Sequence, residues 1–190
     1  MSEIIIYGSK YGSTKRYATE LSGKTGIKCF GFDEVKDLSN YETIIYFGGL
    51  YAGGVLGLKH TIPLLVKNNK QTIIIVTVGL ADTLDSTNIA NINASLARQI
   101  PKEIYERAKM FYLRGGIDYS KLNFGHKTMM KLLYMKAKNL PQEEKTPEIN
   151  VMVDTYNQKV DFVDFDGLNA ITEYLEIPFE SKAQDRNPKL

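Results

Sequence analysis

The sequence predicts an α/β fold in which a parallel sheet is covered by helices on both faces. Five short apolar runs, rich in β-branched and aromatic residues, recur along the chain, and helix-like segments separate most of them. Polar or glycine-rich turns follow the first, third and fourth of these runs. Ligands of parallel sheets bind at the carboxyl ends of the strands, so these three turns predict one shared binding site.

The expected strands and helices largely alternate along the chain. The strands cover 4–8, 27–32, 43–47, 72–78 and 108–113. Helices are expected over 13–23, 58–68 and 88–99, and a last helix runs from a cap at Asp166 through Leu175. The second strand is half polar, which is typical of an edge strand. The glycine-rich stretch 48–54 is expected to be a loop that can bend around a ligand.

Length and composition predict one domain over 1–178, with a C-terminal tail over 179–190. The 190 residues are 43% hydrophobic and 24% charged, as in globular proteins, and no apolar run approaches the about 20 residues that span a bilayer. The absence of a secretory signal pattern and the single cysteine predict a cytoplasmic protein without disulfides. Two histidines and one cysteine, widely separated, predict no metal site. The net charge of +2 gives no reason to expect nucleic-acid binding.

The turn at 9–14 joins the first strand to the first helix. Free N–H groups in the first turn of a helix, together with the helix dipole, favour an anion at this place. Ser9, Ser13 and Thr14 add hydroxyl groups, and Gly12 permits close backbone approach or a positive φ. The spacing fits neither a nucleotide P-loop nor a dinucleotide-binding turn. The turn therefore predicts a phosphate site, and the alternative is an ordinary helix start with hydroxyl side chains as caps.

This turn resembles the FMN-phosphate loop of the flavodoxin family, whose pattern is Ser/Thr-x-Ser/Thr-Gly-x-Thr. Ser9, Gly12 and Thr14 match the pattern, while Tyr11 stands where a hydroxyl amino acid is usual. The resemblance covers roughly 3–114 and the last helix. It implies a flavodoxin-like, five-stranded parallel sheet of order 2-1-3-4-5 and FMN as the cofactor. A helical insertion after strand five is expected as a departure from this family's fold.

The resemblance also implies a set of cofactor-binding residues on three loops. The first loop would bind the FMN phosphate, and the other two would lie on either side of the isoalloxazine ring. Carried over by position, the phosphate residues are Ser9, Lys10, Tyr11, Gly12, Ser13 and Thr14, and the ring residues are Gly49, Leu50, Tyr51, Ala52 and Gly53 on one side and Gly79, Leu80, Ala81 and Asp82 on the other. Tyr51 is the candidate for stacking on the ring, and the alternative is that it packs its own loop in place.

The segment of about 117–164 is too long for an unstructured loop, so it is expected to contain elements of its own. Within it, 126–138 predicts a basic amphipathic helix. Its expected apolar stripe consists of Met129, Leu132 and Leu133, broadened by Met130 and Tyr134, with Lys127, Lys131 and Lys138 largely away from it. Three interpretations remain open: packing over the fold or the flavin edge, a surface for a substrate or partner, and peripheral membrane contact that would make the protein membrane-associated.

The run 114–122 and the Met- and Lys-rich helix after it are similar to the insertion of menaquinone-dependent protoporphyrinogen dehydrogenases. Those enzymes pass electrons from a porphyrinogen to a membrane quinone, so the similarity implies chemistry of this kind. No catalytic side chain is assigned, because a bound flavin carries the reaction. His126 lies in this segment and could meet a substrate, but lone histidines are more often structural or solvent-facing, so neither His126 nor His60 is assigned a catalytic role.

Three functions follow from these observations. The first is an FMN-dependent oxidoreductase that moves electrons between a small reduced substrate, such as a porphyrinogen-like compound, and a quinone or similar acceptor. The second is a non-enzymatic electron carrier that docks onto redox partner proteins. The third is a binding module without FMN. This interpretation is retained because Tyr11 replaces a residue that usually contributes to the phosphate loop of the family. The basic insertion and the net charge of +2 favour the first, since the small carriers of the flavodoxin family are typically strongly acidic.

Overall fold

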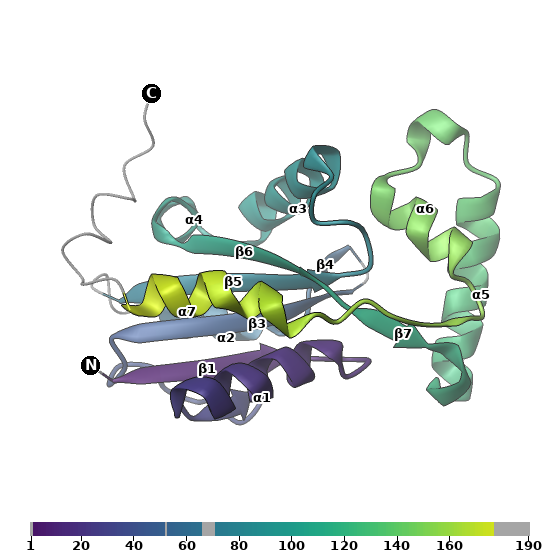
Figure 1. Cartoon of the computed structure of the whole chain (residues 1–190). Coiled ribbons are helices and arrows are strands. Elements are labelled where there is room, and N and C mark those ends of the chain that lie inside the picture. Colours follow the sequence, from purple (N-terminus) through teal and green to yellow (C-terminus); the bar gives the residue numbers. More distant parts are fainter. Residues whose placement is uncertain (1, 52, 66–70, 177–190) are drawn as a thin grey trace.

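The computed structural model describes residues 2–51, 53–65 and 71–176, and its centre is a parallel sheet (Figure 1). The parallel strands are β1 (Glu3–Gly8), β2 (Cys29–Gly31), β3 (Thr43–Tyr51), β5 (Thr72–Gly79) and β6 (Lys109–Arg114). They lie in the order β2-β1-β3-β5-β6, with all neighbours parallel. When the parallel strands are numbered along the chain, this is the predicted order 2-1-3-4-5, and the predicted α/β fold is confirmed.

The sheet has a sixth strand that the sequence did not predict. β4 (Gly54–Val55) pairs antiparallel with the end of β3, where Leu50 opposes Val55 and Tyr51 opposes Gly54. The count of five strands was therefore one too low. Strand β3 runs four residues past its expected end at Phe47, and the chain then reverses through Gly53, whose φ of 78° is accessible mainly to glycine. Clustered glycines predict a loop equally well, so the short hairpin has no separate local signal.

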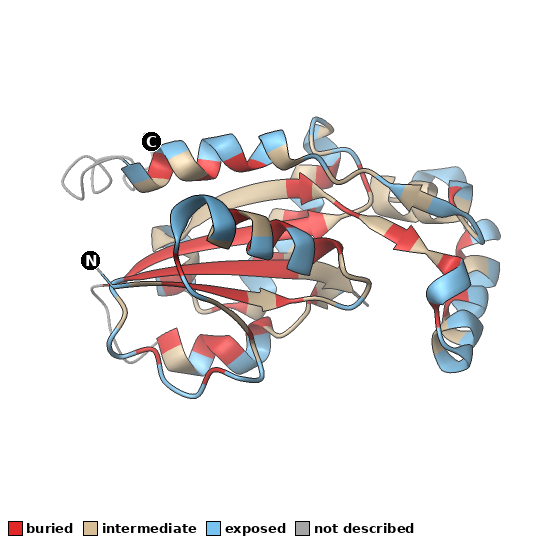
Figure 2. Ribbon diagram, turned by 60° about the horizontal axis from the view of Figure 1, so that its bottom comes forward, coloured by how far each residue is buried: buried red, intermediate tan, exposed pale blue. Residues whose placement is uncertain are grey.

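Two layers of helices cover the sheet because consecutive strand residues point to opposite faces. On one face, Ile5 packs in a cluster with residues of α1 (Ser13–Thr25) and α7 (Asn169–Glu176). On the other face, Ile4 and Ile6 pack with α2 (Leu58–Leu65), α3 (Ser86–Gln99) and α4 (Lys102–Arg107). The inner strands β1, β3 and β5 are mostly buried, whereas the edge strands β2 and β6 are mostly of intermediate burial, as Figure 2 shows.

Several helix ends differ from the expected ones. The helix α3 begins two residues early, because the Asp85 side chain accepts hydrogen bonds from the N–H groups of Thr87 and Asn88. The expected cap Asp166 lies instead inside a 3₁₀ turn, η3 (Phe165–Leu168), whose cap is Asp164. Residues 66–68 of the expected second helix, and the expected tail over 179–190, lie outside the described residues.

The segment after β6 forms a subdomain at the carboxyl ends of the strands (Figure 1). Its elements are β7 (Gly116–Asp118), η1 (Tyr119–Lys121), α5 (Phe124–Lys138), η2 (Gln142–Glu144), α6 (Pro147–Asp154) and β8 (Lys159–Asp161). The strands β7 and β8 form a two-stranded antiparallel ribbon that carries the two helices. We call residues 116–161 the insertion. Among the described residues, no helix has the length and apolar character that crossing a membrane requires.

The expected helix of the insertion exists, but its apolar stripe is arranged differently. The helix begins at Phe124 rather than His126, because the Asn123 side chain accepts a hydrogen bond from the His126 N–H group. Met130 is buried, whereas Leu132 exposes 64% of its surface and therefore faces away from the fold. The sequence left open what this stripe faces, since helical spacing defines faces but does not say which face the fold covers.

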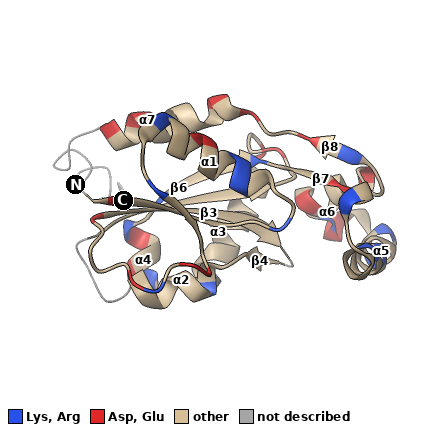
Figure 3. Cartoon of the chain, turned by 90° about the horizontal axis from the view of Figure 1, so that it is seen from below, with Lys and Arg blue, Asp and Glu red and all other residues tan. Residues whose placement is uncertain are grey.

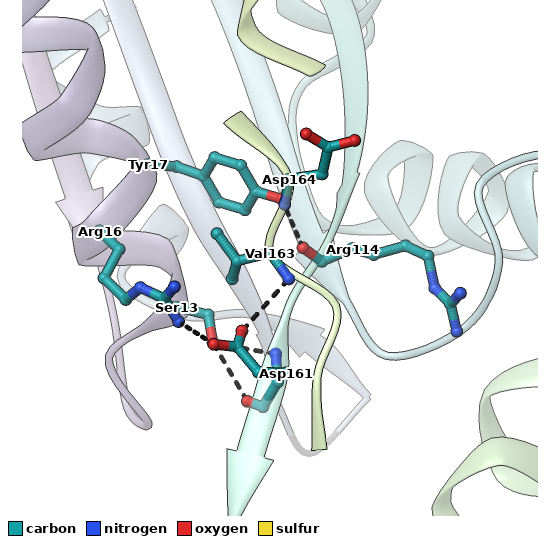
Figure 4. Close-up of polar contacts among 8 residues, drawn as sticks. Ser13, Arg16, Tyr17, Arg114, Asp161, Val163 and Asp164 are labelled. Carbon is teal, nitrogen blue, oxygen red and sulfur yellow. Dashed lines mark hydrogen bonds and ion pairs between the residues drawn. The ribbon is translucent and has the colours of Figure 1, made fainter. Parts of the chain in front are cut away.

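Polar contacts attach the insertion to α1 (Figure 4). The Ser13 hydroxyl donates to the Gly116 carbonyl at 3.1 Å and accepts from the Gly116 N–H group at 2.9 Å. Arg16 forms an ion pair of 2.7 Å with Asp161. The Tyr17 hydroxyl donates to the Arg114 carbonyl at 2.7 Å and accepts from the Asp164 N–H group at 2.9 Å. Both ends of the insertion are therefore held by the first two turns of α1.

Candidate functional site

The three predicted loops meet at one cavity of about 770 Å³ beside the carboxyl ends of β1, β3 and β5. The register explains why they meet, because Gly8 pairs with Gly48 and Gly49 pairs with Val78. The predicted site residues that line this cavity are Lys10, Tyr11, Ser13, Thr14, Gly49, Leu50, Tyr51, Gly53, Gly79 and Leu80. The predicted residues Ser9, Gly12, Ala81 and Asp82 lie next to this set without lining the cavity, and Ala52 lies outside the described residues.

One end of the cavity is the N-terminus of α1. Gly12 stands at the cap position with a φ of 97°, and among the described residues no side chain caps this terminus. The first turn contains no acidic residue. The Ser9 hydroxyl accepts a hydrogen bond of 3.2 Å from the Gly12 N–H group, which closes the turn. Unsatisfied N–H groups and the positive end of the helix dipole together make this end suitable for an anion.

The second loop passes close to the start of α1. Thr14 is buried, and its hydroxyl oxygen lies 2.9 Å from the place where a Cβ at Gly49 would stand. A larger residue at position 49 would therefore push the second loop away from the helix terminus. The hydroxyl of the neighbouring Ser13 is already engaged with Gly116 in both directions. Ser13 thus links the first loop to the insertion. It would bind an anion through its backbone N–H group, because its hydroxyl is occupied.

Tyr11 and Tyr51 form an aromatic wall under the insertion. Their rings pack edge to face with centroids 6.2 Å apart, and the Tyr11 ring is 6.3 Å from that of His126. The Tyr51 hydroxyl lies 3.4 Å from the sulfur of Met129. The Tyr11 hydroxyl is buried and has no hydrogen-bond partner among the described residues, and burial raises its pKa. A buried, unpaired hydroxyl at a cavity wall can donate to a bound ligand.

Tyr11 packs with the core of the insertion rather than with the anion end of the cavity. Its neighbours are the buried residues Ile117, Tyr119, Leu122 and Met130. Burial raises the pKa of Tyr119 to about 12, and its hydroxyl also lacks a partner among the described residues. The tyrosine side chain is much longer than the serine or threonine expected in the resemblance. It therefore reaches across to the insertion, which a short hydroxyl side chain could not do.

The third loop is bound by a residue that the sequence did not single out. The two carboxylate oxygens of Glu148 accept hydrogen bonds from the N–H groups of Leu80 and Ala81, at 3.1 and 2.9 Å. Arg114 donates to the Leu80 carbonyl at 3.2 and 3.0 Å, with its guanidinium 3.9 Å from the Phe162 ring centroid. Glu148 lies in the first turn of α6, which Thr146 caps. A capping threonine followed by an acidic residue predicts the start of a helix. No local pattern in the sequence indicates that Glu148 contacts the third loop, which lies far away along the chain.

The remaining walls come from α3 and the insertion. The insertion supplies mainly apolar side chains, among them Met129, Met130, Leu133, Ile149 and Met152, whereas α3 supplies polar ones such as Asn88, Asn91, Ser95 and Arg98. The sequence signal for Met129, Met130 and Leu133 is the Met-rich helix, since methionine adapts to varied ligands, whereas Ile149 and Met152 on α6 were not singled out. The polar positions of α3 carried no signal, because they resemble an ordinary solvated helix face.

This structure defines an α/β protein with a ligand cavity at the carboxyl ends of its strands, one end suited to an anion and the other apolar and aromatic. The sequence matches the flavodoxin domain over residues 4–144, so the chain belongs to the flavodoxin domain family. The match is to that domain in general and does not single out the protoporphyrinogen dehydrogenase branch. The comparison with curated proteins found no match.

A comparison with solved structures also found matches. A cysteine-to-serine mutant of flavodoxin from Pseudomonas aeruginosa is 16% identical, with 60% of this chain and 84% of that chain covered and a TM-score of 0.36. A cysteine-to-alanine mutant of flavodoxin from the same organism is 16% identical over 73% of this chain and 97% of that chain, with a TM-score of 0.34. A protein from Bacteroides eggerthii DSM 20697 is 13% identical over 58% of this chain and 85% of that chain, with a TM-score of 0.39.

Proposed function

We propose that this protein binds FMN and works as an oxidoreductase that moves electrons between a small reduced substrate and a quinone or similar acceptor. The observation that carries the proposal is the single cavity that joins the uncapped N-terminus of α1 to an aromatic and apolar chamber under the insertion. A flavin mononucleotide has the matching parts, a phosphate at one end and a flat ring system at the other. The similarity of 114–122 to the dehydrogenase insertion suggests a porphyrinogen-like substrate.

The first loop has the groups that a phosphate needs. The N–H groups at the start of α1 and the helix dipole face the cavity end, and no carboxylate of the first turn opposes a negative charge. Lys10 lines the same cavity, with its ammonium group 5.8 Å from the Tyr51 ring centroid, and adds a positive charge. An anion near a helix N-terminus gains about 0.3–1 kcal/mol from the dipole alone, so the loop binds through the sum of several such contacts.

The chamber has the groups that a flat ring needs. Leu50, Tyr51 and Leu80 offer apolar and aromatic surface from the second and third loops. The unpaired Tyr11 hydroxyl can donate to a ring carbonyl or to the substrate. Glu148 holds the Leu80 and Ala81 N–H groups, so a ring that uses these donors has to displace the carboxylate. When bound, the flavin supplies the electron-transfer chemistry, while the protein binds, orients and keeps water away.

The roof over the chamber favours a small substrate over a protein partner. An electron carrier has to present the edge of its flavin to the surface of another protein. Here α5 contacts the second loop through Met129, and α6 contacts the third loop through Glu148, so the insertion would cover a flat ring held between these two loops. In the proposed reaction two electrons and two protons leave the reduced substrate, and the quinone takes up the same number to become a quinol.

The proposal is tested by the visible spectrum of the purified protein before and after addition of FMN, followed by reduction without oxygen. We expect flavin bands that stay with the protein during gel filtration. The reduced protein should be reoxidised faster by a soluble quinone than by cytochrome c, which represents a protein acceptor. Retention of FMN with faster transfer to cytochrome c would favour the carrier. No uptake of FMN at all would overturn the proposal.

A further inference from the structure

The helix α5 is apolar on two opposite faces. Its inner face includes the buried residues Met130 and Ala137. Its outer face bears Phe124, Leu132 and Met135, which expose 86%, 64% and 54% of their surfaces. These three residues recur with Thr128 at the spacing of three and four residues that defines one helical face. The fold covers only the inner face, so the outer face is an apolar surface without a partner among the described residues.

Lysines border the outer face on both sides. Lys127, Lys131 and Lys138 follow one flank at helical spacing, and Lys136 lies on the other flank, where it also lines the cavity. The helix contains no acidic residue. None of the ion pairs between described residues involves these four lysines. In the ribbon of Figure 3, positions of basic residues occur along α5, whereas positions of acidic residues are found on the neighbouring α6.

We propose that the outer face of α5 is a docking surface for an anionic lipid bilayer. Helices that lie in the plane of a membrane interface combine an apolar stripe with flanking lysines, and this is the arrangement found here. The aromatic and aliphatic side chains would enter the boundary between headgroups and acyl chains, and the lysines would contact the anionic headgroups. This function is separate from flavin binding and does not depend on it.

The charges favour lipid over a second copy of the chain as the occupant. A twofold dimer through this face would place α5 against the same helix of its partner. The lysines of the two copies would then face one another without an acidic residue of α5 to pair with them. A bilayer with anionic headgroups instead supplies both an apolar phase and the opposite charge. The rim of the cavity would lie beside the bilayer, because Leu133 lines the cavity and is 41% exposed.

Co-sedimentation with vesicles tests this docking surface. The full chain with FMN added is mixed with vesicles of phosphatidylcholine alone, or of phosphatidylcholine and phosphatidylglycerol in equal amounts. We expect binding to the anionic vesicles only, and weaker binding as salt is raised. Replacing Lys127, Lys131 and Lys138 by Gln should weaken the binding by about 100-fold, since each lysine near an anionic surface contributes about fivefold. Replacing Phe124, Leu132 and Met135 by Ser should abolish it.

The matched control replaces three exposed lysines outside the insertion, Lys28, Lys36 and Lys59, by Gln, and should leave the binding unchanged. Far-ultraviolet circular dichroism checks that each variant is folded, and FMN uptake is recorded for the same samples. Failure of FMN uptake with intact vesicle binding counts against the proposed function and not against this surface. No vesicle binding by the parent chain at low salt would overturn the docking surface. A concentration-dependent dimer that the three Ser substitutions disrupt would also overturn it, in favour of a second copy.

Discussion

The sheet and the insertion form two sides of the same cavity, but they are held together in different ways. The inner parallel strands are buried on both faces, and residues such as Ile45, Ile74 and Phe47 are fully enclosed. In the insertion, α5 has two buried residues and α6 has none. A small aromatic and apolar cluster and a few polar contacts hold it against the sheet. The fold is therefore stabilised by the sheet, whereas the shape of the cavity depends on individual contacts of the insertion.

The largest expected effect tests the sheet side of this comparison. Ile74→Ala removes a fully buried side chain from the inner strand β5 and should lower the free energy of unfolding by about 2–5 kcal/mol. Met135→Ala on the outer face of α5 should change it by less than about 0.5 kcal/mol. Urea denaturation of both variants provides the measurement. Equal losses in the two variants would show that the insertion is as tightly integrated as the sheet.

The joint between the two regions should give an intermediate effect. Tyr17→Phe removes the hydroxyl that bridges the Arg114 carbonyl and the Asp164 N–H group. We expect a loss of about 1–3 kcal/mol, because two partly buried backbone groups lose their partner. Urea denaturation measures the loss, and limited proteolysis within 116–161 should become faster. A variant with unchanged stability and proteolysis would show that the ring alone, and not the hydroxyl, holds the joint.

Glu148 tests whether the insertion and a flavin ring compete for the third loop. Glu148→Gln removes the charge and one of the two acceptors of the Leu80 and Ala81 N–H groups. FMN affinity should rise by about tenfold, in line with the strength of a hydrogen bond to a charged group. The control Glu144→Gln changes an exposed acid in η2 and should leave FMN affinity as it is. Weaker FMN binding in Glu148→Gln would mean that the carboxylate supports the site instead of occupying it.

The smallest expected effect concerns the ion pair between Arg16 and Asp161, whose side chains are each 47% exposed. Partial burial raises the pKa of Asp161, but hydrogen bonds from Arg16 and from the Val163 N–H group outweigh this and hold the pKa below its usual value. A lowered pKa in the folded state contributes stability above the usual carboxyl pKa, and this contribution is lost as pH falls through the folded value. Asp161→Asn should cost less than about 1 kcal/mol at neutral pH and should flatten the stability profile in acid. A loss that stays constant down to the most acidic pH would contradict this account.

The sequence predicted the parts of the molecule whose signal is local. The runs 43–47 and 72–78 are apolar enough to show that they are buried on both faces, and the order of the five parallel strands follows from the resemblance. The first loop was found because glycine and hydroxyl residues sit between a strand and a helix. Most of its neighbours in the second and third loops then fall at the cavity, since parallel strands end at the same edge.

The missed features all depend on where distant segments pack. The contact of Glu148 with the third loop joins residues 67 and 68 positions apart, and the Ser13 contact with Gly116 spans 103 positions. The sequence also left open which face of α5 the fold covers, and in the structure Met130 is buried whereas Leu132 is exposed. The short strand β4 needs only two residues, too few for a periodic pattern. Local spacing defines faces and turns, but it does not define their partners.

The central claim is that the first loop holds a phosphate, and a titration of the parent protein with FMN and with riboflavin tests it most directly. Riboflavin has the same ring and lacks the phosphate. The account predicts that FMN binds at least about tenfold more tightly than riboflavin. Thr14→Val should reduce this preference, because Thr14 lies at the start of α1 beside Gly49. The stability of the fold should stay the same in this variant. Equal affinities for FMN and riboflavin, or no binding of either, would contradict it.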